Sequence, residues 1–230
     1  IDNIQTGLGP TRPPVVIVSP ETENQCREQL RDRDVIFVTQ SDSLGTGDAV
    51  LCAKEVMKDF DGLSLIVWST QPVIRPSTFQ LTVKLASLFD GYEMIVPTAI
   101  RQHPYAPIKR GEFGEVQTAR ETHLERAESV DLGETNIGMF LLKNRMMFEL
   151  LQELKDRYWN EANRSYDRSR GELGFPNELI NTVAQRRNGV FASPIADERE
   201  EQGIKQFSDI AKCELFISEL AHDEAQLRDN

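Results

Sequence analysis

The segment Val35-Ile-Phe-Val-Thr-Gln-Ser-Asp-Ser-Leu-Gly-Thr-Gly-Asp-Ala-Val50 passes from an apolar run through a glycine loop into a helix-like pattern. Val35–Val38 is rich in β-branched residues, which is typical of a strand covered on both faces. After the loop Ser41–Thr46, the range Gly47–Met57 repeats its apolar residues at helical intervals. We therefore predict a strand, a loop and a helix in this order, the repeating unit of α/β proteins.

The same alternation continues on both sides of this segment. Val15–Val18, Leu63–Trp68 and Met94–Pro97 are further apolar runs, and helical patterns at Ser19–Leu30 and Pro76–Phe89 lie among them. Strands and helices that alternate in this way imply right-handed crossovers and a mainly parallel sheet. We predict an α/β fold with a Rossmann-like, mainly parallel sheet that binds ligands at the carboxyl ends of its strands.

The middle of the chain has a different pattern. Ala106–Arg110 and Glu115–Glu121 flank the turn Gly111–Gly114, and together they predict a small β-hairpin subregion. Asn136–Leu142 then has the continuous apolar character of a buried strand, and Lys143–Trp159 has the spacing of a long helix.

The last third completes one predicted domain. Asn160–Gly174 is polar and predicts a loop, either a lid over the site or a disordered surface insertion. A short helix at Glu178–Ala184, a strand at Gly189–Ser193 and a closing helix at Ser208–Leu220 follow. We predict a single domain over residues 1–220 and a polar tail over residues 221–230.

Composition argues against several classes of protein. The formal net charge of -11 disfavours nucleic-acid binding, although local amides and cations can still hold a nucleotide-sized anion. The longest apolar runs are far shorter than the roughly 20 residues of a membrane-spanning helix. The three cysteines and three histidines show no metal-ligand spacing, which argues against a zinc site. Free thiols and the lack of a signal-peptide pattern at the start predict a cytoplasmic protein.

The loop between the first-quoted strand and helix has the chemistry of a nucleotide site. Its backbone amides converge at a helix N-terminus, where the helix dipole favours an anion. Gly45 and Gly47 let the backbone approach a ligand closely, Thr46 adds a hydroxyl, and the Gln40 amide offers both a donor and an acceptor to the edge of a base. Taken alone, the Gly-Thr-Gly pattern fits a plain strand-to-helix turn equally well.

Five ordered motifs make the nucleotide interpretation more specific. Gln40 to Val50 resembles the Gln-x-x-x-Leu-Gly-Thr-Gly-x-Ala motif of sugar-phosphate uridylyltransferases. Four more segments resemble that family in the same order: Trp68-Ser-Thr-Gln-Pro72 (an aromatic residue and Gly-Asp-x-Pro), Tyr105-Ala-Pro-Ile108 (Tyr-Gly-Arg-Ile), Gly114-Glu-Val116 followed by Glu121, and Glu134-Thr-Asn136-Ile-Gly138 (Glu-x-Asn-x-Gly). From about Ile1 to Leu220 the chain is similar to the uridylyltransferase domain of bacterial bifunctional UDP-N-acetylglucosamine pyrophosphorylase/acetyltransferases.

This resemblance implies the nucleotide-diphospho-sugar transferase type of fold, with nucleotide and sugar-phosphate partners and a set of site residues. The nucleotide-binding residues that it implies are Gln40, Leu44, Gly45, Thr46 and Gly47. The sugar- and phosphate-binding residues that it implies are Ser69, Thr70, Ala106, Glu121, Asn136 and Lys205. Alternatives remain open: Glu121 as a surface carboxylate, Asn136 as a turn residue, Trp68 as a core residue and Lys205 as an ordinary surface lysine.

The resemblance also implies Mg²⁺ as a cofactor, but the two protein ligands of the family are replaced. Thr70 stands in place of the Gly-Asp-x-Pro aspartate, and Lys205 in place of a late asparagine. Magnesium prefers hard oxygen ligands, usually including a carboxylate, which this pair does not supply. We hypothesise that the Lys205 ammonium neutralises a pyrophosphate directly; a metal site that uses Asp42, Asp48 or Glu134 is the alternative.

Three functions are compatible with these patterns. One is a nucleotidyltransferase that joins a nucleoside triphosphate to a sugar 1-phosphate such as N-acetylglucosamine 1-phosphate. The second is a catalytically impaired nucleotide-sugar sensor or scaffold, and the third is a structural or partner-binding paralogue. The Gly-rich, Arg- and Lys-containing loop that grips the triphosphate in the resembled family has no match before Val15. The late residues also lack the short repeat of the acetyltransferase half, so that second activity is not predicted.

Overall fold

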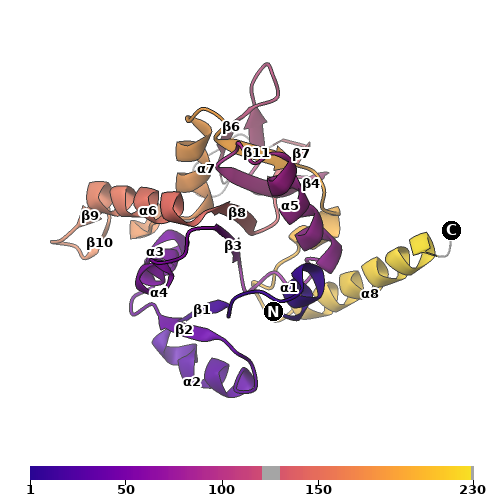
Figure 1. Cartoon of the computed structure of the whole chain (residues 1–230), viewed down its shortest axis with the longest axis horizontal. Helices are drawn as coiled ribbons and strands as arrows, with labels where there is room; N and C mark the ends of the chain where they lie inside the picture. The colour runs from indigo at the N-terminus through magenta and orange to yellow at the C-terminus, as the bar shows by residue number, and fades with distance from the viewer. Residues whose placement is uncertain (121–129, 229–230) are drawn as a thin grey trace.

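The first part of the chain forms a small α/β layer of its own. The computed structural model describes residues 1–120 and 130–228. After helix α1 (Asp2–Leu8), strand β1 (Val15–Val18) pairs in parallel with β2 (Ile36–Thr39), and α2 (Pro20–Gln29) connects them. Pro20 opens α2, where its missing N–H leaves no helical bond unmade. Within the described residues, β1 and β2 form a separate two-stranded sheet, below the other strands in Figure 1.

The helix predicted at Gly47–Met57 is divided into two. Helix α3 covers Thr46–Cys52 and α4 covers Lys54–Met57. At the junction, the Ala53 N–H donates to the carbonyl of Val50 at 3.0 Å, an i→i−3 bond that tightens the turn. Strand β3 (Leu63–Val67) and helix α5 (Pro76–Leu88) then follow close to their predicted positions.

The central sheet has the strand order β11, β4, β8 and β3. Its strands are β11 (Val190–Ser193), β4 (Met94–Gln102), β8 (Met139–Lys143) and β3, and β7 (Leu132–Asn136) also pairs with β4. Strands β3, β4 and β11 run in the same direction, whereas β7 and β8 run antiparallel to β4. The predicted α/β class is confirmed.

The strand predicted at Asn136–Leu142 is interrupted. Asn136 is the last residue of β7, and β8 begins only at Met139. Thr98 pairs with Asn136 and Met94 pairs with Leu142, so β4 advances by four residues while its partner advances by six. The two extra residues, Ile137 and Gly138, form a bulge that turns the backbone, a feature often found beside functional sites.

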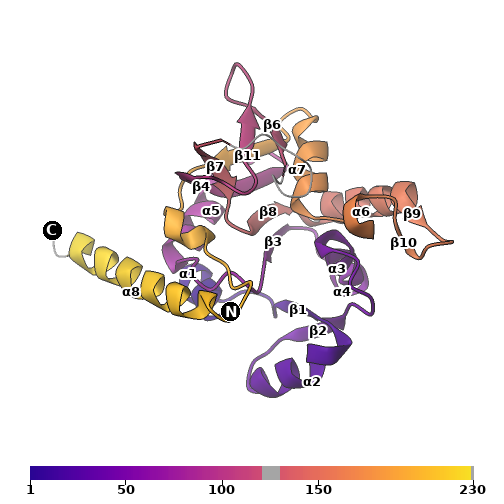
Figure 2. The same ribbon diagram turned by 180° about the vertical axis from the view of Figure 1, so that it is seen from behind.

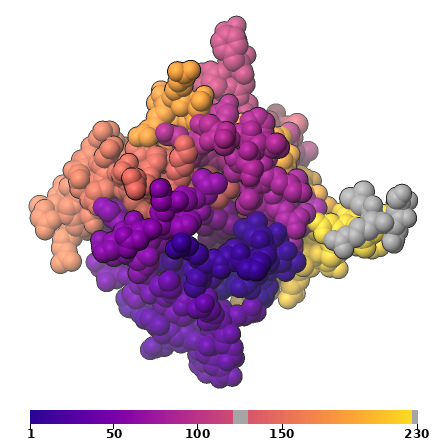
Figure 3. Space-filling model, in the orientation of Figure 1, coloured from indigo at the N-terminus to yellow at the C-terminus, as the bar shows by residue number. Residues whose placement is uncertain are grey.

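Two hairpins lie outside the central sheet. Strands β5 (Ile108–Arg110) and β6 (Val116–Ala119) form the predicted hairpin, whose tip projects from the molecule in Figures 1 and 3. The loop predicted at Asn160–Gly174 instead contains the end of a short hairpin, β9 (Trp159–Asn160) with β10 (Ser165–Tyr166), and a helical turn η1 (Ser169–Gly171). Tyr166 and Leu173 are 2% and 0% exposed, so this segment is anchored in the core and is not a disordered insertion.

The largest hydrophobic core lies between the central sheet and two helices. Helix α6 (Asn144–Tyr158) contributes Met147 and Leu151, and α7 (Pro176–Ala184) contributes Leu179. These side chains pack with Phe140 of β8 and are each 0% exposed. Close packing against α6 and α7 therefore fixes the positions of the strand ends that border this core.

The C-terminal helix extends beyond its predicted end. After the helical turn η2 (Glu198–Glu201), helix α8 covers Asp209–Arg228 and reaches away from the central sheet in Figure 2. Residues 221–228, predicted as a polar tail, continue this helix. Among the described residues, no helix combines the length and apolar character that crossing a membrane requires.

Candidate functional site

The glycine loop, defined here as Gln40–Asp48, lies between the end of β2 and the first turn of α3. Gly45 has a φ of 96°, a backbone region that residues with a Cβ rarely adopt. A Cβ at Gly45 would lie 2.5 Å from the carbonyl oxygen of Leu173. Glycine is therefore required here both by the backbone angle and by the close approach of a second segment.

That second segment, Leu173–Phe175, is hydrogen-bonded along the glycine loop. The Leu173 N–H donates to the carbonyl of Leu44, and the Gly47 N–H donates to the carbonyl of Leu173, both at 2.8 Å. The Phe175 N–H donates to Oγ1 of Thr46 at 2.9 Å. The amide of Gly47 and the hydroxyl oxygen of Thr46, both predicted to meet a nucleotide, are thus already used to hold the loop in place.

The side chain of Gln40 is also engaged on its donor side. Its Nε2 donates to Oδ2 of Asp48 at 2.9 Å and to the carbonyl of Gly45 at 3.2 Å. Tyr166 donates its hydroxyl to the other Asp48 oxygen at 2.6 Å. Burial and then the hydrogen bond to Asp48 raise the pKa of Tyr166, so the phenol stays protonated across the neutral range. Gln40 therefore keeps its Oε1 acceptor as the atom available to a base.

Four segments far apart in the sequence form a second group, which we call the sugar-side cluster: Trp68–Gln71, Tyr105, Asn136–Gly138 and Gly203–Lys205. The Ile204 N–H donates to the carbonyl of Thr70 at 2.8 Å, so the two segments that carry Thr70 and Lys205 touch. Both Thr70 and Lys205 are exposed. The structure thus brings together the two segments that carry the residues predicted to replace the family's metal ligands.

Asn136 and Tyr105 connect the rest of the sugar-side cluster. The Tyr105 hydroxyl donates to Oδ1 of Asn136 at 2.8 Å, and the Gly138 N–H donates to the same oxygen at 3.1 Å. A backbone N–H can only donate, so the Asn136 amide has one orientation, with Oδ1 bound and Nδ2 directed elsewhere. The Lys205 Nζ lies 5.5 Å from the centroid of the Tyr105 ring. A cation, a phenol and a buried amide therefore lie next to one another.

A row of aromatic rings connects the two halves of the site. The Trp68 and Phe140 ring centroids are 6.0 Å apart, and those of Phe140 and Phe175 are 5.4 Å apart. Phe175 in turn donates its backbone N–H to Thr46 of the glycine loop. Tilted ring pairs at these distances pack favourably, so the row holds the glycine loop and the sugar-side cluster in a fixed relation.

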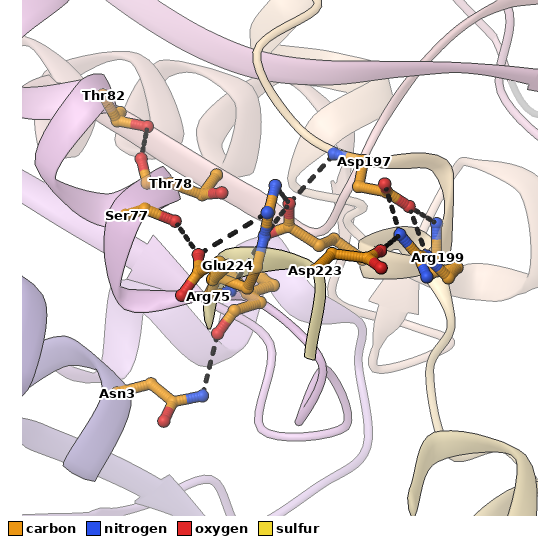
Figure 4. A network of polar contacts seen from close by, with 11 residues as sticks. Asn3, Arg75, Ser77, Thr78, Thr82, Asp197, Arg199, Asp223 and Glu224 are labelled. Carbon is orange, nitrogen blue, oxygen red and sulfur yellow. Dashed lines mark hydrogen bonds and ion pairs between the residues drawn. The ribbon is translucent and has the colours of Figure 1, made fainter. Parts of the chain in front are cut away.

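A polar network, shown in Figure 4, holds the segment that carries Gly203–Lys205 in place. Glu200 is fully buried and accepts two hydrogen bonds from the Arg75 guanidinium and one from the Arg75 backbone N–H, at 2.8–3.0 Å. Arg199 binds Asp197 at 2.8 Å and Asp223 of α8 at 2.7 Å. Because Arg75 directly precedes α5, this network joins α5, η2 and α8 around the sugar-side cluster.

Two of the three carboxylates named as alternative metal ligands, Glu134 and Asp48, are already paired with other side chains. Both oxygens of Glu134 bind Arg110, and one also accepts from Thr98 at 2.5 Å. The bond to Glu134 raises the pKa of Arg110, which keeps this guanidinium charged. Asp48 is bound by Gln40 and Tyr166. Over residues 1–120 and 130–228, no group of three or more His, Cys, Asp or Glu side chains could hold a metal ion.

The remaining predicted residues differ in how the structure places them. Ser69 is exposed beside Thr70. Ala106 is 1% exposed, and its carbonyl accepts from the Thr135 hydroxyl at 3.2 Å, so its methyl group lies inside the protein. Glu121 lies outside the described residues. Gln71 and Glu200 were missed by the sequence analysis; only the position of Gln71 next to Thr70 in the motif was a signal for it.

Comparisons with known proteins agree with the motifs. The chain matches no family model. It is 25% identical over 205 residues to the bifunctional protein GlmU of Geotalea daltonii, which covers 88% of this chain and 42% of that protein. The GlmU protein of Pediococcus pentosaceus is 26% identical over 217 residues, which cover 91% of this chain and 43% of that protein. The GlmU protein of Exiguobacterium sibiricum is 32% identical over 158 residues, which cover 68% of this chain and 34% of that protein. The chain therefore spans less than half the length of these curated relatives, and the resemblance drawn from the motifs is confirmed.

Proposed function

We propose, from the premise that the chain is a relative of the bifunctional protein GlmU, that it binds a nucleoside triphosphate or a UDP-sugar between the glycine loop and the sugar-side cluster. In this proposal the side-chain Oε1 of Gln40 accepts a hydrogen bond from the base. Leu44, Gly45, Thr46 and Gly47 border the base and ribose. The sugar and its phosphates lie against the second group of residues.

One observation carries this proposal. Asn136 is fully buried, its Oδ1 is fixed by two donors, and its Nδ2 has no hydrogen-bond partner in the described chain. Buried polar groups are almost always paired, and leaving one unpaired costs about 1–3 kcal/mol. A ligand oxygen removes this cost, which supports a sugar-binding role for Asn136.

Charge at the site supports the phosphate part of the proposal. Lys205 lies beside the Tyr105 ring and next to the Thr70 segment, and the nearby Glu134 is neutralised by Arg110. Two unit charges about 4 Å apart attract by about 4 kcal/mol at an effective dielectric near 20. In the proposal the Lys205 ammonium, with this attraction reduced by solvent at its exposed position, takes the place of a metal ion beside the pyrophosphate.

The reaction that follows is nucleotidyl transfer. An oxygen of the sugar 1-phosphate, for example N-acetylglucosamine 1-phosphate, attacks the α-phosphorus of the nucleoside triphosphate. The bond from the α-phosphorus to the bridging oxygen breaks, and pyrophosphate leaves with that electron pair. Such transfers depend mainly on positioning and charge neutralisation, so the fixed sugar-side cluster and Lys205 are the groups we assign to it.

A second candidate function is a nucleotide-sugar sensor or scaffold that binds without transfer. Thr70, Lys205 and the paired Glu134 favour it, because they do not supply the oxygen ligands that a bridging metal needs. Release of pyrophosphate by the protein, measured with four nucleoside triphosphates and several sugar phosphates, separates the two. Turnover supports the transferase, and binding with no turnover supports the sensor.

Calorimetry of UDP-sugar binding tests the proposal directly. We expect the native protein to bind with the same affinity in magnesium and in chelator, and Lys205→Ala to lose roughly 10-fold or more in affinity, about 1.4 kcal/mol. Lys212→Ala is the control, because the Lys212 Nζ also lies 5.5 Å from an aromatic ring, that of Phe216, on α8. Equal affinity of the native protein and Lys205→Ala would remove Lys205 from the site, and a strict magnesium requirement would contradict metal-free binding.

A further inference from the structure

Buried polar atoms without partners gather at the sugar-side cluster. Among the described side chains, four such atoms are buried without a hydrogen-bond partner, and three of them belong to Trp68 (Nε1), Gln71 (Oε1) and Asn136 (Nδ2). The fourth is Oγ1 of Thr78 on α5. Each such group costs about 1–3 kcal/mol while it is unpaired, so a molecule that pairs all three gains binding energy there.

Gly138 lies at the centre of this group. Its φ is 75°, and a Cβ there would lie 2.8 Å from Cε3 of Trp68 and 2.9 Å from Cγ of Gln71. Its backbone N–H binds Asn136, and its carbonyl accepts the backbone N–H of Trp68 at 3.0 Å. The bulge between β7 and β8 thus packs directly against the turn after β3 and brings all three side chains around one glycine.

The chemistry of the three groups defines what they recognise. The Trp68 indole N–H and the Asn136 amide can only donate at the atoms that are free, whereas the Gln71 amide supplies an acceptor. None of the three side chains is charged. An uncharged group that both accepts and donates hydrogen bonds, such as a sugar hydroxyl or an acetamido group, satisfies this set, whereas a phosphate has no proton to give to Gln71.

We propose that Trp68 and Gln71, together with Asn136, form a subsite that binds an uncharged hydroxyl or acetamido group of the sugar and selects the sugar over the bare nucleotide. This inference rests on the proposed function. It adds Gln71 to the site and assigns the indole N–H of Trp68, rather than its ring face, to ligand binding. Lys205, beside this subsite, binds the charged pyrophosphate of the ligand.

Two variants test the subsite. Trp68→Phe removes the N–H and keeps a smaller ring against Phe140, and Gln71→Met keeps the chain length and removes the amide. Replacing an unpaired buried polar group by an apolar one of similar shape is neutral or stabilising, so the urea midpoint of the free Gln71→Met variant should stay equal or rise. Trp68→Phe should lose some stability, because the smaller ring leaves a cavity in the core. For both variants we expect the affinity for UDP-N-acetylglucosamine to fall roughly 3- to 15-fold and the affinity for UDP to stay unchanged.

Thr78→Val is the matched control, because it removes the fourth unpaired atom from a helix outside the cluster. It should leave both affinities unchanged and keep or raise the urea midpoint. Native-like binding of UDP-N-acetylglucosamine by Trp68→Phe and Gln71→Met would overturn the subsite and leave the proposed function standing. Failure of the native protein to bind either UDP or the UDP-sugar would instead overturn the proposed function. If Trp68→Phe does not fold, the affinities of Gln71→Met for UDP-N-acetylglucosamine and UDP decide whether the subsite exists.

Discussion

Gly45 shows how a single residue determines the shape of the glycine loop. Its positive φ is one that the Gly-Thr-Gly pattern permits, but the contact of the loop with Leu173 joins segments more than 120 residues apart in the sequence. The sequence therefore indicates that the loop needs glycine. Only the folded chain shows the second reason, which is the close approach of the Leu173 carbonyl.

Substitution of Gly45 should separate these two reasons. We expect Gly45→Ala to lower the free energy of unfolding by roughly 1–3 kcal/mol through backbone strain and by a further amount through the clash with the Leu173 carbonyl. Gly114→Ala is the control, because Gly114 has a similar φ of 81° but nothing within 4 Å of the added Cβ. Urea unfolding measures both. Equal losses would mean that the close approach to Leu173 costs nothing.

Asn136 was selected from a motif, and the structure adds a separate reason to propose it as a site residue. The motif placed it at the start of a strand, whereas it ends β7 at a two-residue bulge. Its significance in the structure comes from an unpaired Nδ2, which depends on Tyr105 and Gly138 occupying the other side of the amide. No local pattern specifies such a three-way contact.

At the scale of elements, α8 and η2 act as a clamp on the site. Arg199 connects Asp197, which caps η2, with Asp223 on α8, and Ser77 of α5 donates to Glu224 at 2.7 Å. The predicted polar tail is helical because its acidic side chains find these basic and hydroxyl partners. Propensity alone could not identify them, since Arg199 and Asp223 are separated by 24 positions.

The stability that the Asp197–Arg199 pair contributes should fall as the pH is lowered. Arg199 holds the pKa of Asp197 below its usual range, so this carboxylate stabilises the fold above about pH 4 and loses that contribution as pH falls through its folded pKa. We expect Asp197→Asn to be less stable than the native protein at pH 7, and the difference to shrink as the pH falls below about 4. Urea midpoints measured from pH 3 to pH 7 check this. A difference that does not change with pH would contradict the role of Asp197 as a charged partner of Arg199.

At the scale of the whole molecule, the fold class was predicted correctly, but the first two strands do not join the central sheet. The runs Val15–Val18 and Ile36–Thr39 have the composition of strands covered on both faces, yet they form a pair of their own and are only partly buried. Two-stranded sheets are marginal without further cover. The molecule therefore combines a tightly packed central sheet with a weaker N-terminal layer.

Native-state hydrogen exchange should detect this difference. We expect the paired amides of β1 and β2 to exchange through local opening, with lower protection than those of β4 and β8, whose residues belong to the buried core. A UDP-sugar should raise protection in the glycine loop after β2. Uniform protection across all four strands would show that the N-terminal layer opens only with the whole molecule.

The order of strands and helices, the loop at Gln40–Asp48 and the family resemblance followed from the sequence alone. These features depend on residues close together in the chain, through apolar periodicity, glycine positions and short motifs. Only the tertiary structure decided that Thr70 bonds the segment that carries Lys205 and that Glu134 is paired with Arg110. It also decided that Trp68, Gln71 and Asn136 surround Gly138 with unpaired atoms. Hydrogen-bond satisfaction and charge pairing depend on which distant side chains meet, and that is determined when the layers pack.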